Sequence, residues 1–127
     1  MTRGTTGRGV VLALVIAVSA GCGTPVALRT APAAVDACDQ ALIGGVLVPS
    51  SQSGLAVQPT ARNQEMVEVL WPFGYSAVRD LEGAMTLRDA SGKEIAREGE
   101  TILMGGGLGA NGVWAACAGT VESAPGI

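Results

Sequence analysis

Short apolar runs, each ended by glycine, proline or a polar turn, limit what this 127-residue chain can fold into more than any other feature. The run over 41–48 stops at Pro49, and the serine-rich segment 50–54 is predicted to turn the chain into a second run over 55–57, so that the two runs form a hairpin. Runs this short favour strands, since helices of globular domains need about ten residues or more. The pattern predicts an all-β fold, either a small antiparallel barrel or a compact sandwich, of about six or seven short strands.

Alternation of apolar and polar residues supports this prediction. In the stretch 66–71, Val67, Val69 and Trp71 fall on one side, which indicates a strand, although a helix over 61–70 is the alternative. The clearest hairpin joins 84–88 to 93–97 through Asp89-Ala90-Ser91-Gly92. The last predicted strands cover 101–104 and 113–118, with a glycine-rich loop between them.

The N-terminus has the layout of a secretory signal peptide. Arg3 and Arg8 precede an apolar stretch over 10–18, and small residues follow before Cys22. As a helix this stretch would span about 14 Å, against roughly 30 Å of membrane hydrocarbon. A permanent transmembrane anchor is the alternative, but the glycines and proline within 21–25 argue against it.

The ending Val18-Ser19-Ala20-Gly21-Cys22 resembles the lipobox of bacterial lipoproteins. The resemblance implies cleavage before Cys22, a thioether-linked diacylglyceryl group on its sulfur, and a chain exported and held on a bacterial membrane with its domain outside the cytoplasm. Several acyl chains on one residue give a stable anchor. Ser19 departs from the family, which usually has Leu at that position. Ordinary signal peptidase cleavage, releasing a secreted protein that starts at Gly21, is the alternative.

The chain has three cysteines, and an odd number leaves one thiol unpaired in an exported protein. If Cys22 carries lipid, Cys38 and Cys117 remain as a pair. A disulfide between them would contribute roughly 4 to 5 kcal/mol in the chain-entropy account. Two separate buried thiols are the alternative.

These observations divide the chain into four predicted parts. Residues 1–21 are the signal peptide, 22–35 the lipidated N-terminus and a flexible tether, 36–120 the β domain, and 121–127 a frayed tail.

Charge and composition exclude several functions. The chain has no histidine, the commonest metal ligand and general base, and its formal net charge is −3. Removal of Arg3 and Arg8 with the leader would make it more acidic, which argues against nucleic-acid binding. The methionines lack the close spacing of a soft-metal site, so no metal is expected. Residues 107–112 match G-x-G-x-x-G formally, but a strand is predicted to follow where a dinucleotide site needs a helix, so no cofactor is expected.

Only 3% of the residues are aromatic, and most of these surround Pro72 and Gly74. Trp71 and Tyr75 are predicted to lie in the core, and a place on a binding surface is the alternative for Tyr75. Exposed aromatic rings stack on sugars or anchor a partner peptide, so the candidate binding surface consists of Phe73, Tyr75, Gly107 and Leu108. An envelope protein or a glycan is the expected partner.

Pairs of carboxylates can hydrolyse glycosidic bonds when roughly 5 to 9.5 Å apart. The carboxylates available for such a pair are Glu65, Glu68, Glu94, Glu98 and Glu100. Their spacing establishes no pair, so a small envelope hydrolase is the alternative function and no catalytic residue is assigned.

The segment Trp71-Pro72-Phe73-Gly74-Tyr75-Ser76, the hairpin after it, the glycine triplet 105–107 and the late Cys117 resemble a pattern in small uncharacterised bacterial envelope proteins. No activity is attached to that pattern. Together these features predict a membrane-anchored envelope lipoprotein with a non-catalytic binding or assembly domain.

Overall fold

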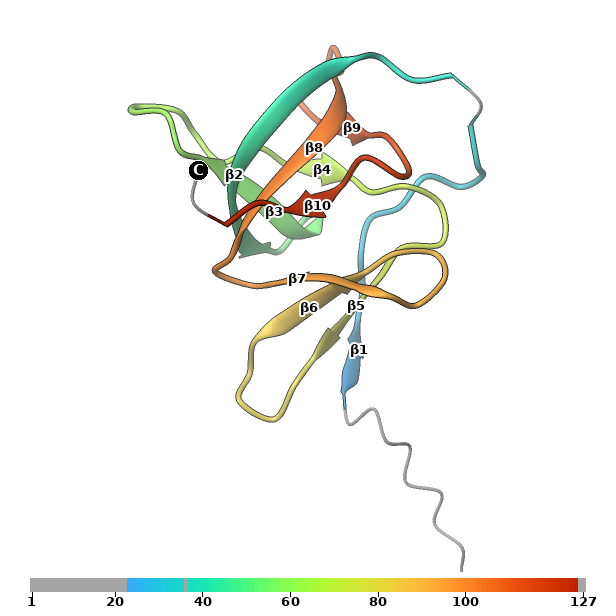
Figure 1. The fold of residues 1–127 in the computed structure, drawn as a ribbon, viewed down its shortest axis with the longest axis vertical. Coiled ribbons are helices and arrows are strands. Elements are labelled where there is room, and N and C mark those ends of the chain that lie inside the picture. Colours follow the sequence, from blue (N-terminus) through green and yellow to red (C-terminus); the bar gives the residue numbers. More distant parts are fainter. Residues whose placement is uncertain (1–22, 36, 126–127) are drawn as a thin grey trace, which may run out of the picture.

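The computed structural model describes residues 23–35 and 37–125, and all regular elements in these residues are strands (Figure 1). They are β1 (Thr24–Val26), β2 (Ala41–Ser50), β3 (Gly54–Pro59), β4 (Val69–Leu70), β5 (Ser76–Arg79), β6 (Met85–Arg88), β7 (Glu94–Arg97), β8 (Thr101–Leu108), β9 (Trp114–Ala116) and β10 (Glu122–Ser123). The all-β prediction is confirmed. The helix considered over 61–70 does not form, because this stretch contributes β4 to a sheet.

The larger sheet has the strand order β3-β2-β8-β9-β4, with β10 also paired to β8. Serine at the end of β2 turns the chain back into β3, as the sequence predicted. At the far side of the sheet, Val67 exchanges backbone hydrogen bonds of 2.8 and 3.1 Å with Val57 of β3. This contact nearly closes the sheet into a barrel. The pairing of β4 with β9 is parallel, which the prediction of an antiparallel fold missed.

The smaller sheet has the order β1-β5-β6-β7 and lies below the barrel in Figure 1. It contains the predicted hairpin: β6 and the edge strand β7 pair antiparallel across the turn at Asp89, whose carboxylate accepts hydrogen bonds from the amides of Ser91 and Lys93. Met85 and Leu87 of β6 are buried. Period-two alternation therefore identified the inner face of this sheet correctly.

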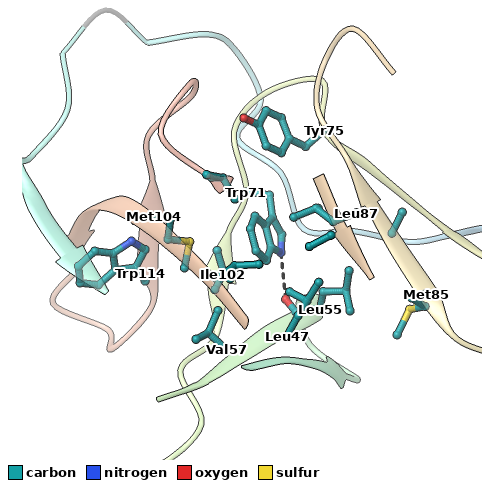
Figure 2. Packing of buried hydrophobic residues seen from close by; sticks show 14 residues of the cluster. Leu47, Leu55, Val57, Trp71, Tyr75, Met85, Leu87, Ile102, Met104 and Trp114 are labelled. Carbon is teal, nitrogen blue, oxygen red and sulfur yellow. Dashed lines mark hydrogen bonds between the residues drawn. The ribbon is translucent and has the colours of Figure 1, made fainter. Parts of the chain in front are cut away.

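One hydrophobic core joins the two sheets around Trp71, which is fully buried (Figure 2). Ile102 of the barrel lies on one side of the indole and Leu87 of the smaller sheet on the other. The indole Nε1 donates a 2.9 Å hydrogen bond to the carbonyl oxygen of Leu55, so its polar atom is satisfied inside the core.

The glycine triplet 105–107 belongs to strand β8, so the loop predicted there is wrong. A side chain on Gly106 would collide with the Ala115 carbonyl and the Trp114 indole, and one on Gly107 would meet the Asp39 carboxylate. Glycine is present because neighbouring segments approach the strand closely. The turn is confined to 109–112, where the amide of Gly112 bonds the carbonyl of Gly109 at 3.0 Å.

The sequence predicted a flexible tether over 22–35. This prediction is wrong for much of 23–35, the part that the structure describes. β1 pairs with β5, with Thr24 opposite Arg79. Further along, the amide of Arg29 donates to Ser53 at 2.9 Å and the amide of Ala31 to Trp71 at 2.8 Å. Pro25 fits because β1 is an edge strand, where a missing N–H costs no ladder bond.

The predicted tail also belongs to the fold. Val121 is 8% exposed in the core, and β10 pairs with β8. The domain therefore extends beyond the predicted limits of 36–120 at both ends. Its strands exceed the predicted number because β1 and β10 lie in the segments taken as tether and tail, and because the short β5 gave no signal.

Cys38 and Cys117 form a disulfide, with their Cα atoms 5.9 Å apart and a sequence separation of 79. The bond ties the chain just before β2 to the chain just after β9. The predicted signal peptide and Cys22 lie outside the described residues.

Candidate binding surface

Phe73 lies at a sharp bend that separates it from its aromatic neighbours. Trp71 and Tyr75 are 0% and 7% exposed, whereas Phe73 is 51% exposed. Simple alternation would place all three on one face. Instead, the amide of Tyr75 bonds the carbonyl of Pro72 at 3.1 Å and Gly74 adopts a φ of 86°, which closes a turn with Phe73 outside it.

Two shallow hollows beside Phe73 are lined mainly by small apolar residues. The hollow that contacts Phe73 has a volume of about 70 Å³, and its neighbour about 400 Å³. Both are bordered by Ala31, Val35 and Ala116, so they adjoin one another. We call Phe73, together with Ala31, Val35 and Ala116 of both hollows, the Phe73 surface.

One wall of this surface is formed by the described residues that lead from Ala31 to the disulfide, namely Ala31, Ala33, Ala34, Val35, Ala37 and Cys38. Val35 is 70% exposed although it is apolar. The segment is held in place at Ala31 by the hydrogen bond to Trp71 and at Cys38 by the disulfide. Sequence reasoning missed this wall because it took the segment as a tether. Its run of alanine and valine was the available signal.

The predicted binding residues divide between surface and core. Phe73 and Leu108 are exposed, the latter by 62%. Gly107 is buried in β8 but borders the larger hollow. Leu108 borders neither hollow. Tyr75 is wrong as a surface residue, because its ring packs in the core and its hydroxyl accepts a 3.5 Å hydrogen bond from the amide of Gly119.

The Phe73 surface offers contact area and little reactive chemistry. Asp39 is the one ionisable side chain among the described residues that line the two hollows, since Cys38 is in the disulfide. An apolar surface with an exposed aromatic ring can bind a complementary side chain or the face of a sugar ring.

A separate polar cluster lies where the β2–β3 turn meets β4. The hydroxyls of Ser50 and Ser53 each donate a 2.6 Å hydrogen bond to Oε1 of Glu68, and the amide of Val69 donates to Ser53 Oγ at 3.0 Å. Burial would raise the pKa of Glu68, but the bonds from both serines and the charge of Arg29 hold that pKa below its ordinary value. These hydrogen bonds attach the β2–β3 turn to the start of β4.

Of the other carboxylates considered for hydrolysis, Glu65 is exposed, and the remaining three contact neighbouring groups of the smaller sheet. Glu98 accepts the amide of Met85 at 3.0 Å, and Glu100 accepts the amide of Arg97 at 2.7 Å. Glu94 lies 3.7 Å from Arg88. These contacts stabilise turns and strand ends of the smaller sheet.

Within the described residues there is no group of three or more His, Cys, Asp or Glu side chains that could hold a metal ion. No helix in this part of the chain is long and apolar enough to cross a membrane.

Comparison with known proteins adds no relative: no family model matches this chain, and neither curated proteins nor solved structures give a significant match.

Proposed function

We propose that this chain is an exported lipoprotein, anchored to a bacterial membrane through diacylglyceryl on Cys22, whose β domain binds an envelope protein or a glycan at the Phe73 surface. The Cys38–Cys117 disulfide is the observation that carries the proposal. Such bonds persist in oxidising compartments outside the cytoplasm. With this pair joined, Cys22 is the one remaining cysteine, and it stands at the lipobox-like position.

The anchor is tested by labelling cells with radioactive palmitate. The natural chain should incorporate label into a membrane-bound product, and Cys22→Ser should incorporate none. The matched control is the double variant Cys38→Ser/Cys117→Ser, which keeps Cys22 and should stay labelled. Label that persists in Cys22→Ser would contradict the anchor.

The binding role rests on the exposure of Phe73 beside the apolar hollows. Phe73 and Val35 are both exposed and border the same apolar hollow, and contiguous exposed apolar surface of this kind is typical of interaction sites, whereas a single exposed apolar residue is not. The domain would act by binding alone, with Glu68, Glu98 and Glu100 engaged in hydrogen bonds to turns and strand ends.

The partner is tested with a photoreactive amino acid at position 73 in living cells. A specific cross-linked product should form at position 73 and be lost when Val35→Asp places a charge at the edge of the hollow. Gln52, exposed in the β2–β3 turn, is the matched control position and should give no such product. Equal products at both positions, or none at position 73, would argue against the Phe73 surface.

A further inference from the structure

The first described strand begins very close to the proposed lipid. Thr24 starts β1 and is only two residues from Cys22, so their Cα atoms are at most about 7 Å apart. Thr24 is held opposite Arg79 at the end of β5. A lipid on Cys22 would therefore bring this end of the smaller sheet to the membrane, with no intervening tether.

The turn that follows Arg79 projects from the same end. It joins β5 to β6 and carries Leu81, whose side chain is 93% exposed. Figure 1 shows this turn and the start of β1 together at the lower end of the molecule. Chain lengths and strand spacing keep the Cα atoms of Cys22 and Leu81 within about 20 Å of one another.

The turn does not need leucine for its own structure. The equivalent turn at the opposite end of β6 has the same hydrogen bonds: Gly83 to Asp80 and Gly92 to Asp89, both at 3.0 Å, with each aspartate also accepting two amides. The residue after aspartate is Leu81 in one turn and Ala90 in the other. Leu81 is thus an apolar side chain that the turn does not need, exposed to water at the end of the domain next to Cys22.

The turn is closed by hydrogen bonds, and its local charges are paired. Arg79 donates a 2.7 Å hydrogen bond to the carbonyl of Gly83 across its base. Arg97 pairs with both acids that flank Leu81, at 2.8 Å to Asp80 and 3.0 Å to Glu82. Leu81 can therefore approach a lipid surface without carrying unpaired neighbouring carboxylates into it.

We infer that the β5–β6 turn is a membrane-contact site, at which Leu81 inserts into the interfacial region of the bilayer that holds the lipid on Cys22. This inference rests on the anchor proposed above. It sets the orientation of the domain: the smaller sheet stands on the membrane, and the Ala90 turn at the far end of β6 points away from it. Two contacts, a lipid and a leucine, fix an orientation that one anchor leaves free.

The test uses the full lipidated chain, purified from membranes and reconstituted into phosphatidylcholine vesicles. Leu81→Cys and, as its match in the equivalent turn, Ala90→Cys each provide a single thiol for a bimane fluorophore, because the other cysteines are in the disulfide or bear lipid. Nitroxide lipids should quench the label at 81 at least about threefold more than the label at 90, since an inserted side chain lies only about 5 to 10 Å into the headgroup boundary.

Two results would overturn the inference while leaving the anchor intact: equal quenching at both positions, or no quenching at 81. A label at 81 that is shielded in native envelopes but not in lipid vesicles would point to a protein partner and would also overturn it. The mass of each variant separates the two claims. A product without diacylglyceryl on residue 22 would refute the anchor, and the membrane contact with it.

Discussion

At the scale of single residues, Trp71 packs against side chains of both sheets. Its ring is fully buried between side chains of both sheets, and its N–H satisfies a core carbonyl that would otherwise be unpaired. The sequence predicted the buried position from period-two alternation. It could not predict the bond to Leu55, because that contact depends on how the barrel closes.

Replacing Trp71 by phenylalanine should lower the free energy of unfolding by about 2 to 4 kcal/mol, because it leaves a cavity and an unsatisfied Leu55 carbonyl. Urea denaturation measures the loss. Phe73→Ala is the control and should cost less than about 1 kcal/mol, since its ring is half exposed. An equal loss in the two variants would contradict the placement of Phe73 at the surface.

Glu68 should make stability depend on pH. Its pKa is lowered in the folded chain, so its ionised form contributes stability above the ordinary value of 4.5, and this contribution is lost as the pH falls through the lowered native pKa. Glu68→Gln should cost about 1 kcal/mol at neutral pH. The cost should shrink in acid.

Unfolding curves recorded from neutral to acidic pH test this dependence. Glu94→Gln is the matched control, because the side chain of Glu94 is 68% exposed and its contact with Arg88 is long, at 3.7 Å. The account would fail if Glu68→Gln destabilised the domain equally at every pH.

At the scale of elements, local turn chemistry was predictable and long-range pairing was not. The Asp89 turn and the serine turn after β2 carry their own signals, so both hairpins were predicted from short windows. β4 pairs in parallel with β9, and β1 pairs with β5, across long stretches of chain. No local pattern encodes such partners. The glycines of β8 resemble a loop in the sequence because the contacts that require them, with Trp114 and Ala115 of β9 and with Asp39, form only when the sheet is assembled.

The residues of the candidate site were likewise predictable only where local sequence determines their position. Phe73 was identified from its residue type and neighbours. Tyr75 was included as a possible surface residue because it is aromatic, but it lies buried like Trp71, and the turn at Pro72 and Gly74 places only Phe73 outside. Val35 was misplaced, because its position depends on a segment held at Ala31 and Cys38. The lipobox-like ending remains a prediction, as it lies outside the described residues.

Hydrogen exchange tests the ordered state of the segment after β1. The amides of Arg29 and Ala31 should exchange slowly, because they donate hydrogen bonds to the backbone carbonyls of Ser53 and Trp71. Exposed Ala33 and Ala34 in the same segment should exchange faster. Uniformly fast exchange across residues 24–35 would contradict this ordered state and support the predicted flexible tether.

At the scale of the whole molecule, the structure is a disulfide-closed β domain whose first strand begins two residues after Cys22, the residue that we propose carries lipid. Because no long tether intervenes, the proposed anchor and the β5–β6 turn would together determine which face of the domain meets the membrane and which remains available to a partner. The Phe73 surface and the β5–β6 turn are then separate contacts with separate roles.

The intact mass of the purified membrane-bound protein, recorded before and after reduction, tests the central claim most directly. The account predicts a chain that begins at Cys22, carries diacylglyceryl on that residue, and gains about 2 Da when its single disulfide is reduced. A chain that begins elsewhere, or one that begins at Cys22 without acyl groups, would contradict it.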